Sequence, residues 1–272
     1  MRFASAVSRR LSAGGAIRPL EGHVAWVVGG AGVVGQGITR GLLNAGAFVI
    51  VNSRHPQKLQ KLSEELDHPE QLVTINASML PDSADKTVSK AMEISGNRLD
   101  HVVAHSAVRW WDADGGDETT TVSRGPSLLH VSPMEYAQMA NQLGSLHYAT
   151  AHLLTPLLSD EGSFTFVTSN ADSFAGRSSA MAQINAHGVM GLAAAMRSEA
   201  AVANWKARVG ELRLGPGLRL NRSKSEREAD PRETPLSHDI GRVAAGIAAK
   251  GTGGLVQAAD LFEFELLKQQ YA

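Results

Sequence analysis

The stretch that decides the fold is the apolar run HVAWVV at residues 23–28, followed by the glycine-rich run GGAGVVGQG at residues 29–37. Residues 38–45 then continue with apolar side chains at helical spacing. A strand, a glycine turn and a helix in this order are typical of a dinucleotide-binding unit. The alternative is a glycine-rich turn that binds nothing.

In a dinucleotide-binding unit each glycine has its own task. Gly30 makes the tight turn, Gly32 lets the backbone approach a pyrophosphate, and Gly35 lets the helix pack closely on the strand. The phosphates lie at the helix N-terminus, where free N–H groups point outward. We therefore predict that a cofactor contacts this turn through Gly30, Gly32, Val33, Val34 and Gly35.

The end of the second predicted strand, residues 48–52, favours one cofactor over another. A ribose with free hydroxyls is usually bound by an acidic residue about 20 residues past the first glycine. This chain has Asn52, Ser53 and Arg54 there. Arg54 can pair with a 2′-phosphate and Ser53 can donate a hydrogen bond, which favours NADP(H) over NAD(H). Alternatively, Arg54 is an exposed residue that precedes a helix starting at Pro56.

Length, charge and composition indicate one α/β domain and exclude several function classes. The 272 residues fit one doubly wound domain with a sizeable core. The net charge of −1 gives no reason to expect nucleic acid as a partner. The absence of cysteine excludes disulfides, thiolate catalysis and cysteine-based zinc sites. No apolar run approaches the roughly 20 residues that span a bilayer.

The first 20 residues differ in composition from the rest. They contain four arginines, several serines and no acid, and Phe3, Val7 and Leu11 would form one apolar face of a helix. This composition is typical of an organelle-import peptide, for a mitochondrion or alternatively a plastid. A basic tail without a targeting role is the other interpretation. Residues 21–272 are then the globular domain.

Beyond the second strand, strands and helices continue to alternate. Strands are predicted at residues 72–76, 100–105, 162–169, 209–214 and 253–257. Helices are predicted at residues 82–95, 133–158, 180–203, 237–250 and 260–270. The helix after Ser132 has Pro133 at its first position and a capping box completed by Glu135. This order predicts a Rossmann-like doubly wound parallel sheet with helices on both faces.

Two segments interrupt the alternation. The inserted loop at residues 109–131 opens with Trp110 and Trp111, which are core anchors or an interface patch, and contains several acids. The spacing of these acids does not match a calcium loop, so we predict no metal site there. Residues 218–236 are dense in charges of both signs and are predicted to form a flap.

Five motifs in this order resemble those of the short-chain dehydrogenase/reductase family over about residues 21–257. They are the glycine turn at residues 29–37, Asn141-Gln142-Leu143-Gly144, the strand that ends in Ser169, Gly188-Val189-Met190-Gly191-Leu192, and Pro216-Gly217. The resemblance implies further cofactor contacts at the ends of later strands. These are Asn76, His105, Ser106, Ala107, Pro216 and Gly217.

The resemblance also implies a catalytic set, of which half is missing. In the family a tyrosine transfers the proton, a lysine lowers the pKa of that tyrosine, a serine orients the carbonyl, and an asparagine holds a relay water. Ser169 and Asn141 match the last two, whereas the tyrosine and lysine positions are Ala182 and Ala186. In addition, Val108 replaces a glycine where the nicotinamide ribose would pass. Alanine can neither transfer a proton nor carry charge.

Two hypotheses of different classes follow. The first is a catalytically inactive reductase that serves as an accessory subunit of an organellar complex or as a homo-oligomer, with NADP(H) optional. The second is a divergent NADP(H)-dependent oxidoreductase in which a pair such as His105 and Ser169 replaces the lost groups. His187 follows the lysine position, but one residue turns about 100° on a helix, so it is expected to point away.

Overall fold

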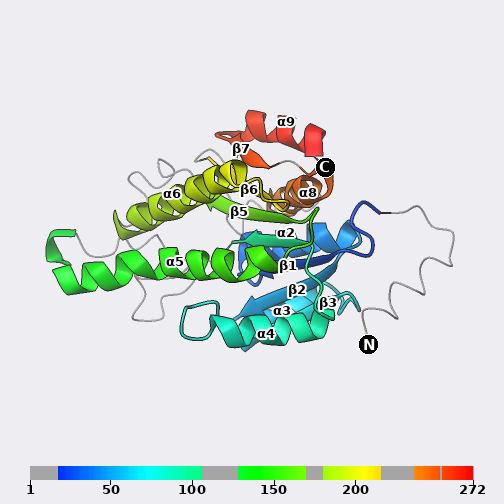
Figure 1. The fold of residues 1–272 in the computed structure, drawn as a ribbon, viewed down its shortest axis with the longest axis horizontal. Helices are drawn as coiled ribbons and strands as arrows, with labels where there is room; N and C mark the ends of the chain where they lie inside the picture. Colours follow the sequence, from blue (N-terminus) through cyan, green and yellow to red (C-terminus); the bar gives the residue numbers. More distant parts are fainter. Residues whose placement is uncertain (1–17, 106–127, 170–179, 216–235, 252, 272) are drawn as a thin grey trace, which may run out of the picture.

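The computed structural model describes residues 18–105, 128–169, 180–215, 236–251 and 253–271. Within these ranges the strands form a seven-stranded sheet in the order β3-β2-β1-β4-β5-β6-β7, and every neighbouring pair is parallel. Helices cover both faces of the sheet (Figure 1). The predicted doubly wound α/β fold is therefore confirmed.

The elements follow the predicted order. The strands are β1 (Val24–Val28), β2 (Phe48–Ser53), β3 (Leu72–Asn76), β4 (His101–Ala104), β5 (Ser163–Ser169), β6 (Arg208–Leu214) and β7 (Gly254–Ala258). The helices are α2 (Val33–Asn44), α3 (Pro56–Glu65), α4 (Ala84–Ser95), α5 (Pro133–Leu154), α6 (Ala180–Val202), α8 (Leu236–Lys250) and α9 (Leu261–Tyr271). Short 3₁₀ turns are η1 (Leu128–His130) and η2 (Thr155–Leu157).

Most helix boundaries lie within two residues of the prediction, and two differences have a structural interest. The helix predicted to reach residue 158 ends at Leu154 and continues as η2, because Pro156 has no N–H to donate within an α-helix. The last but one helix begins at Leu236, one residue before the predicted cap at Ser237. The predicted capping box of α5 is present, with Ser132 and Glu135 each bonding the other's backbone N–H.

Several predicted features lie outside the described residues. They are the import-like segment up to residue 17, Val108, the tryptophan pair Trp110 and Trp111 with most of the inserted loop, and the charged flap up to residue 235.

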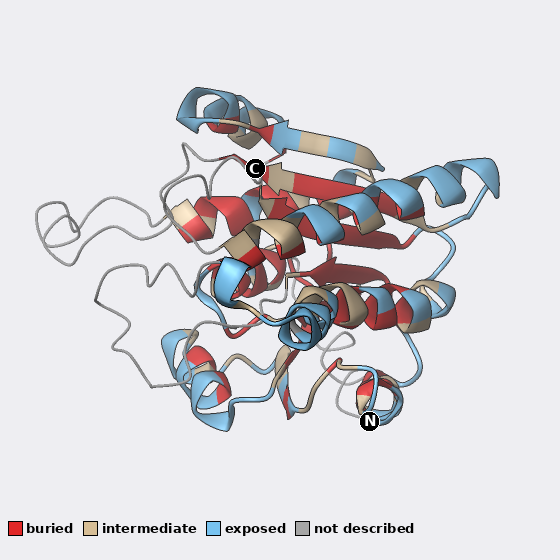
Figure 2. Ribbon diagram, turned by 90° about the vertical axis from the view of Figure 1, so that its left-hand side faces the viewer, coloured by how far each residue is buried: buried red, intermediate tan, exposed pale blue. Residues whose placement is uncertain are grey.

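The core consists of two apolar layers, one on each side of the sheet. Helices α2, α3, α8 and α9 cover one face, and α4, α5 and α6 cover the other. Figure 2 shows buried strands between helices whose outer surfaces are exposed. Trp26 of β1 is fully buried and donates its indole N–H to the side chain of Asn52 at 2.9 Å. This bond joins β1 to the end of β2, next to the predicted cofactor site.

Helices α2 and α8 cross at contact distance. A methyl group added to Gly37 would lie 1.8 Å from the carbonyl oxygen of Ser237, and one added to Gly41 would lie 2.1 Å from that of Gly241. Gly241 would in turn meet the carbonyl oxygen of Gly37 at 1.8 Å. Only glycine fits these three positions, so α2 is fixed from its outer side.

A buried ion cluster joins α6 to the sheet. The fully buried carboxylate of Glu211 on β6 accepts hydrogen bonds from Arg197 of α6 at 2.9 Å, from Arg213 at 2.9 Å and from Thr168 of β5 at 2.7 Å. Removing one partner of such a pair would leave a buried charge uncompensated. The cluster therefore fixes α6 against β5 and β6.

A second polar cluster lies at the amino ends of the strands. Buried His101 has ring nitrogens 2.9 Å from the Nδ1 atom of His23 and 2.9 Å from the hydroxyl of Ser163, and the two imidazoles stack at 5.1 Å. Desolvation, followed by repulsion from His23, lowers the pKa of His101 to about 4, although Asp100 opposes the shift. The imidazole is therefore neutral at pH 7.

This pKa predicts a loss of stability at mildly acidic pH. An unfolded chain protonates the imidazole below about pH 6.5, whereas folded His101 does so only near pH 4. The free energy of unfolding should therefore fall as pH decreases from about 6.5 to 4, by up to about 1.4 kcal/mol per pH unit for this group. Urea unfolding at several pH values measures the slope.

The slope should decrease in His101→Asn and stay unchanged in a variant of the exposed His187, His187→Gln. Burial also lowers the pKa of His105 to about 4, so part of the slope should remain. An unchanged slope in His101→Asn would contradict the assignment.

Candidate nucleotide-binding site

The candidate site lies where the strand order of the sheet reverses. β1 pairs with both β2 and β4, so Val28 is level with Asn52 on one side and with Ala104 on the other. Helix α2, which follows β1, and helix α5, the next described α-helix after β4, pack on opposite faces of the sheet. Ligands of open α/β folds bind at such a point.

Two of the predicted glycines are required by packing. A methyl group added to Gly30 would lie 2.7 Å from a methyl group of Val51. One added to Gly35 would lie 2.5 Å from the carbonyl oxygen of Gly29 and 2.6 Å from the Cα atom of Gly30. These contacts press the first turn of α2 onto β1, as the sequence predicts.

Gly32 is different, because its own surroundings do not require glycine. A methyl group there would meet a single atom within 4 Å, the carbonyl oxygen of Gly29 at 3.9 Å. The backbone at Gly32 has φ −86° and ψ 171°, which any residue adopts. The residue is exposed. The open space before Gly32 is thus available to a ligand.

The start of α2 offers hydrogen-bond donors to an anion. Gly32 is its N-cap and supplies no side-chain hydrogen bond, and the first turn contains no acid. The N–H groups of this turn have no acceptor within the helix. Val33 is exposed and Val34 is buried, so only the first of the two side chains borders the opening. Glycine cradle and helix N-terminus together fit a pyrophosphate.

The three residues at the end of β2 differ in their surroundings and in their hydrogen-bond partners. Asn52 is buried, and its amide bonds Trp26 and the backbone of Ala77. Ser53 accepts a hydrogen bond from the backbone N–H of His55 at 3.2 Å. Arg54 is exposed, and no ion pair engages it among the described residues. The guanidinium of Arg54 and the O–H of Ser53, which can still donate, are left for a ligand.

Asn76 ends β3 beside this segment. It is level with Ser53 in the sheet register and is exposed. The structure therefore brings the ends of β1, β2 and β3 together as predicted. Ser106, Ala107, Pro216 and Gly217, which were predicted to contact the cofactor, lie outside the described residues.

His105 is at the site through its backbone rather than its ring. Its N–H donates to the carbonyl of Val28 at 2.9 Å, which extends the β1–β4 pairing. The ring lies among β5 and α5, where it bonds the backbone of Val167. Desolvation, followed by the charge of His147, lowers the pKa of His105 to about 4. No hydrogen bond joins His105 to Ser169 in the part of the chain that the structure describes.

The family-derived catalytic positions are not joined into one network. Ser169 ends β5 and is half-buried. Asn141 is exposed, and its amide nitrogen donates to the carbonyl of Ala137 in the same helix at 2.8 Å. Ala186 is half-buried on α6, and Ala182 lies one turn before it. His187 is exposed and bonds the carbonyl of Gln183, so it points away from the core as expected.

Asn185 is a polar residue that the sequence analysis missed. It is 2% exposed, its amide nitrogen donates to the carbonyl of Met181, and its amide oxygen has no hydrogen-bond partner among the described residues. Met181, Asn185 and Val189 share one face of α6 at four-residue spacing. A lone asparagine within that apolar stripe was the signal that could have identified it.

The described ranges contain no group of three or more His, Cys, Asp or Glu side chains that could hold a metal ion. None of the helices in those ranges has the length and apolarity to span a bilayer.

Comparisons with known proteins agree with this geometry. Residues 25–92 match the family model described as NADP oxidoreductase, coenzyme F420-dependent, which spans the glycine turn and the ends of β2 and β3. No curated protein sequence matches the chain.

Solved structures of short-chain dehydrogenases/reductases superpose on most of the chain. A metagenomic short-chain oxidoreductase in complex with NADP is 19% identical, with a TM-score of 0.66, and the match covers 89% of this chain and 98% of that one. A double mutant from Serratia marcescens is 16% identical, with a TM-score of 0.65 and coverages of 88% and 97%. A dehydrogenase/reductase from Sinorhizobium meliloti is 16% identical, with a TM-score of 0.66 and coverages of 88% and 94%.

The chain has the short-chain dehydrogenase/reductase fold. The predicted resemblance is confirmed at this level, and the likeness covers 88% to 89% of the chain.

The glycine contacts predict that one alanine substitution destabilises the fold and another leaves its stability nearly unchanged. Gly35→Ala forces a methyl group against backbone atoms and should lower the free energy of unfolding by about 1–3 kcal/mol. Gly32→Ala should change it by less than about 0.5 kcal/mol, because the space is open. Denaturant unfolding of both variants without nucleotide measures the difference. Equal destabilisation would show that Gly32 is also a packing residue.

Proposed function

We propose that this chain is a short-chain dehydrogenase/reductase that retains an NADP(H) site and has lost acid–base turnover. In this proposal it serves as an accessory subunit of a mitochondrial complex. The observation that carries the proposal is the contrast between an intact nucleotide cradle and alanine at both proton-transfer positions, Ala182 and Ala186.

The loss of turnover rests on the chemistry of the remaining groups. Ser169 has no described base within hydrogen-bond distance, and a free serine hydroxyl is a poor proton donor near neutral pH. His105 is held by the backbone of Val167 with a pKa of about 4, so it is neutral and engaged elsewhere. These features argue against the pair of His105 and Ser169 as a replacement catalyst.

The retained cofactor site rests on Gly32 and Arg54. Gly32 leaves room in front of the α2 N-terminus that the packing of the protein does not use. Arg54 offers a planar guanidinium at the end of β2, where a 2′-phosphate would be recognised. NADP(H) is therefore favoured over NAD(H). A bound dinucleotide would here stabilise the subunit, since a ligand that binds only the folded state adds to its stability.

The accessory role rests on the amino terminus and on the outer faces of two helices. Residues 1–20 have the composition of an import peptide for the mitochondrion, with the plastid as alternative. The outer sides of α5 and α6 contain Gly144, Gly188 and Gly191, where an added methyl group would meet open space. Partner subunits of an organellar complex, or further copies of this chain, can approach such a surface closely.

The experiment that tests the role is the native size of the endogenous protein in gently solubilised organelles, with mass-spectrometric identification of co-migrating proteins. Co-migration with a large complex supports the accessory role. A free dimer or tetramer, together with NADPH-dependent turnover of a carbonyl panel that falls in Ser169→Ala, would refute it.

The cofactor preference predicts a selective effect of one substitution. Arg54→Ala should weaken NADPH binding by about tenfold or more, because a charge-assisted hydrogen bond to the 2′-phosphate is lost. NADH binding should stay within about twofold. Titrations monitored by calorimetry measure both affinities, with Lys58→Ala, which removes an exposed cation in the first turn of α3, as the matched control. A parallel loss for both nucleotides would rule out a 2′-phosphate contact.

A further inference from the structure

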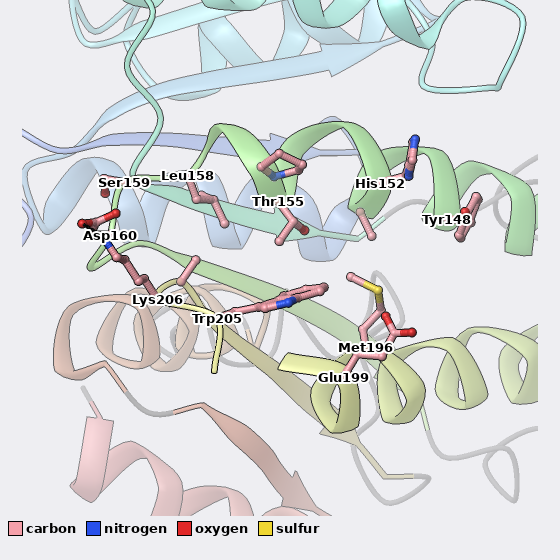
Figure 3. Close-up of a pocket in the computed structure, with 13 residues that line it drawn as sticks. Tyr148, His152, Thr155, Leu158, Ser159, Asp160, Met196, Glu199, Trp205 and Lys206 are labelled. Atoms are coloured by element: carbon pink, nitrogen blue, oxygen red, sulfur yellow. Dashed lines mark hydrogen bonds and ion pairs between the residues drawn. The ribbon is translucent and has the colours of Figure 1, made fainter. Parts of the chain in front are cut away.

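A pocket of about 530 Å³ lies between α5 and α6 (Figure 3). Its lining includes Ser159 and Asp160, which precede β5, and Lys206 and Ala207, which precede β6. These residues are at the amino ends of the strands, whereas the nucleotide site is at the carboxyl ends. The pocket is therefore separate from the nucleotide site.

The walls of the pocket are apolar and aromatic. Tyr148 of α5 and Trp205, which follows α6, border it together with Met196. Figure 3 shows the indole of Trp205 extending toward Met196 below the helix that carries Tyr148 and Thr155. Tyr148 is 55% exposed and Trp205 is 36% exposed, so large rings line an accessible space. Pockets of this size and lining hold ligands of about drug size.

The two carboxylates and the lysine of the lining leave one net negative charge beside His152, whose ring stacks on Tyr148. Asp160 and Lys206 pair with each other at 2.5 Å, which neutralises both. Glu199 projects from α6 into the lining, and no ion pair engages its carboxylate among the described residues. The hydroxyl oxygen of Thr155 is also buried without a hydrogen-bond partner in that part of the chain. Glu199 can accept a hydrogen bond from a ligand, whereas the enclosed Thr155 oxygen lies out of reach of one.

We propose that this pocket binds an organic cation, with an apolar body between Tyr148 and Trp205 and an ammonium group directed at Glu199. Aromatic faces attract cations, so the two rings favour the same ligand class as the carboxylate. Glu199 also restricts the charge of the ligand. A neutral ligand would leave its carboxylate without an ionic partner, and an anion would be repelled by it.

The test uses the full chain and three probes of one shape, which are 2-phenylethylamine, 2-phenylethanol and 3-phenylpropanoate. Ligand-observed NMR titration should give an affinity order of amine over alcohol over carboxylate, with about a tenfold preference for the amine over the alcohol. Glu199→Gln should abolish this preference and leave alcohol binding unchanged. Glu93→Gln, the same change at an exposed site on α4, should have no effect.

Three results would overturn the proposal. The first is equal binding of all three probes, and the second is an unchanged preference in Glu199→Gln. The third is a wild-type protein that is a dimer and binds none of the probes, while Trp205→Ala is a monomer. The pocket would then be an interface between copies of this chain. Trp205→Phe keeps an aromatic wall and should retain amine binding. If Trp205→Ala loses amine binding while Trp205→Phe keeps it, the loss comes from the missing ring and not from unfolding. None of these results depends on NADP(H) binding or on turnover.

Discussion

The position of α2 is the constraint on which the nucleotide site depends. On its inner side Gly30 and Gly35 bring the first turn into contact with β1 and β2, and on its outer side Gly37 and Gly41 meet α8. A helix held at contact distance on both sides cannot slide or rotate, because interiors are close-packed. Its free N–H groups are therefore fixed at the carboxyl end of β1 whether or not a nucleotide is present.

Within the glycine turn, some glycines are required for packing and another is available for ligand binding. Gly30 and Gly35 would be kept by packing alone, so their presence is weak evidence that the chain binds a nucleotide. Gly32 has no comparable contact, and a larger residue there would fit the protein itself. Its glycine is therefore the residue of the turn that argues for a ligand.

Much of the fold could be predicted from the sequence because local patterns determine it. The buried parallel strands are continuous apolar runs, and α5 begins at a capping box that needs only Ser132, Pro133 and Glu135. The glycine turn and the segment at residues 52–54 were also placed correctly. What the sequence did not reveal depends on partners far along the chain. The Glu211 cluster needs Thr168 and Arg197, and only the register of β5 and β6 brings them together.

The roles of adjacent polar residues show the same limit at the site. Asn52, Ser53 and Arg54 are equally polar in the sequence, yet the first bonds Trp26, the second bonds the following turn, and the third faces solvent. Likewise the ring of His105 lies among β5 and α5, whereas the sequence places it only at the edge of the sheet. The direction of a side chain at the end of a strand depends on the elements that pack beside it.

Helix α6 explains how such a fold can persist without the catalytic pair. Its attachment to the sheet comes from the ion pair of Arg197 with Glu211 and from the buried residues Met181, Val189 and Met196. Ala186 is half-buried and contributes no polar contact to that attachment. Exchanging a proton-transferring side chain for alanine at such a position removes chemistry without removing the anchor of the helix. The contacts that hold α6 on the sheet therefore do not depend on which side chains occupy the proton-transfer positions.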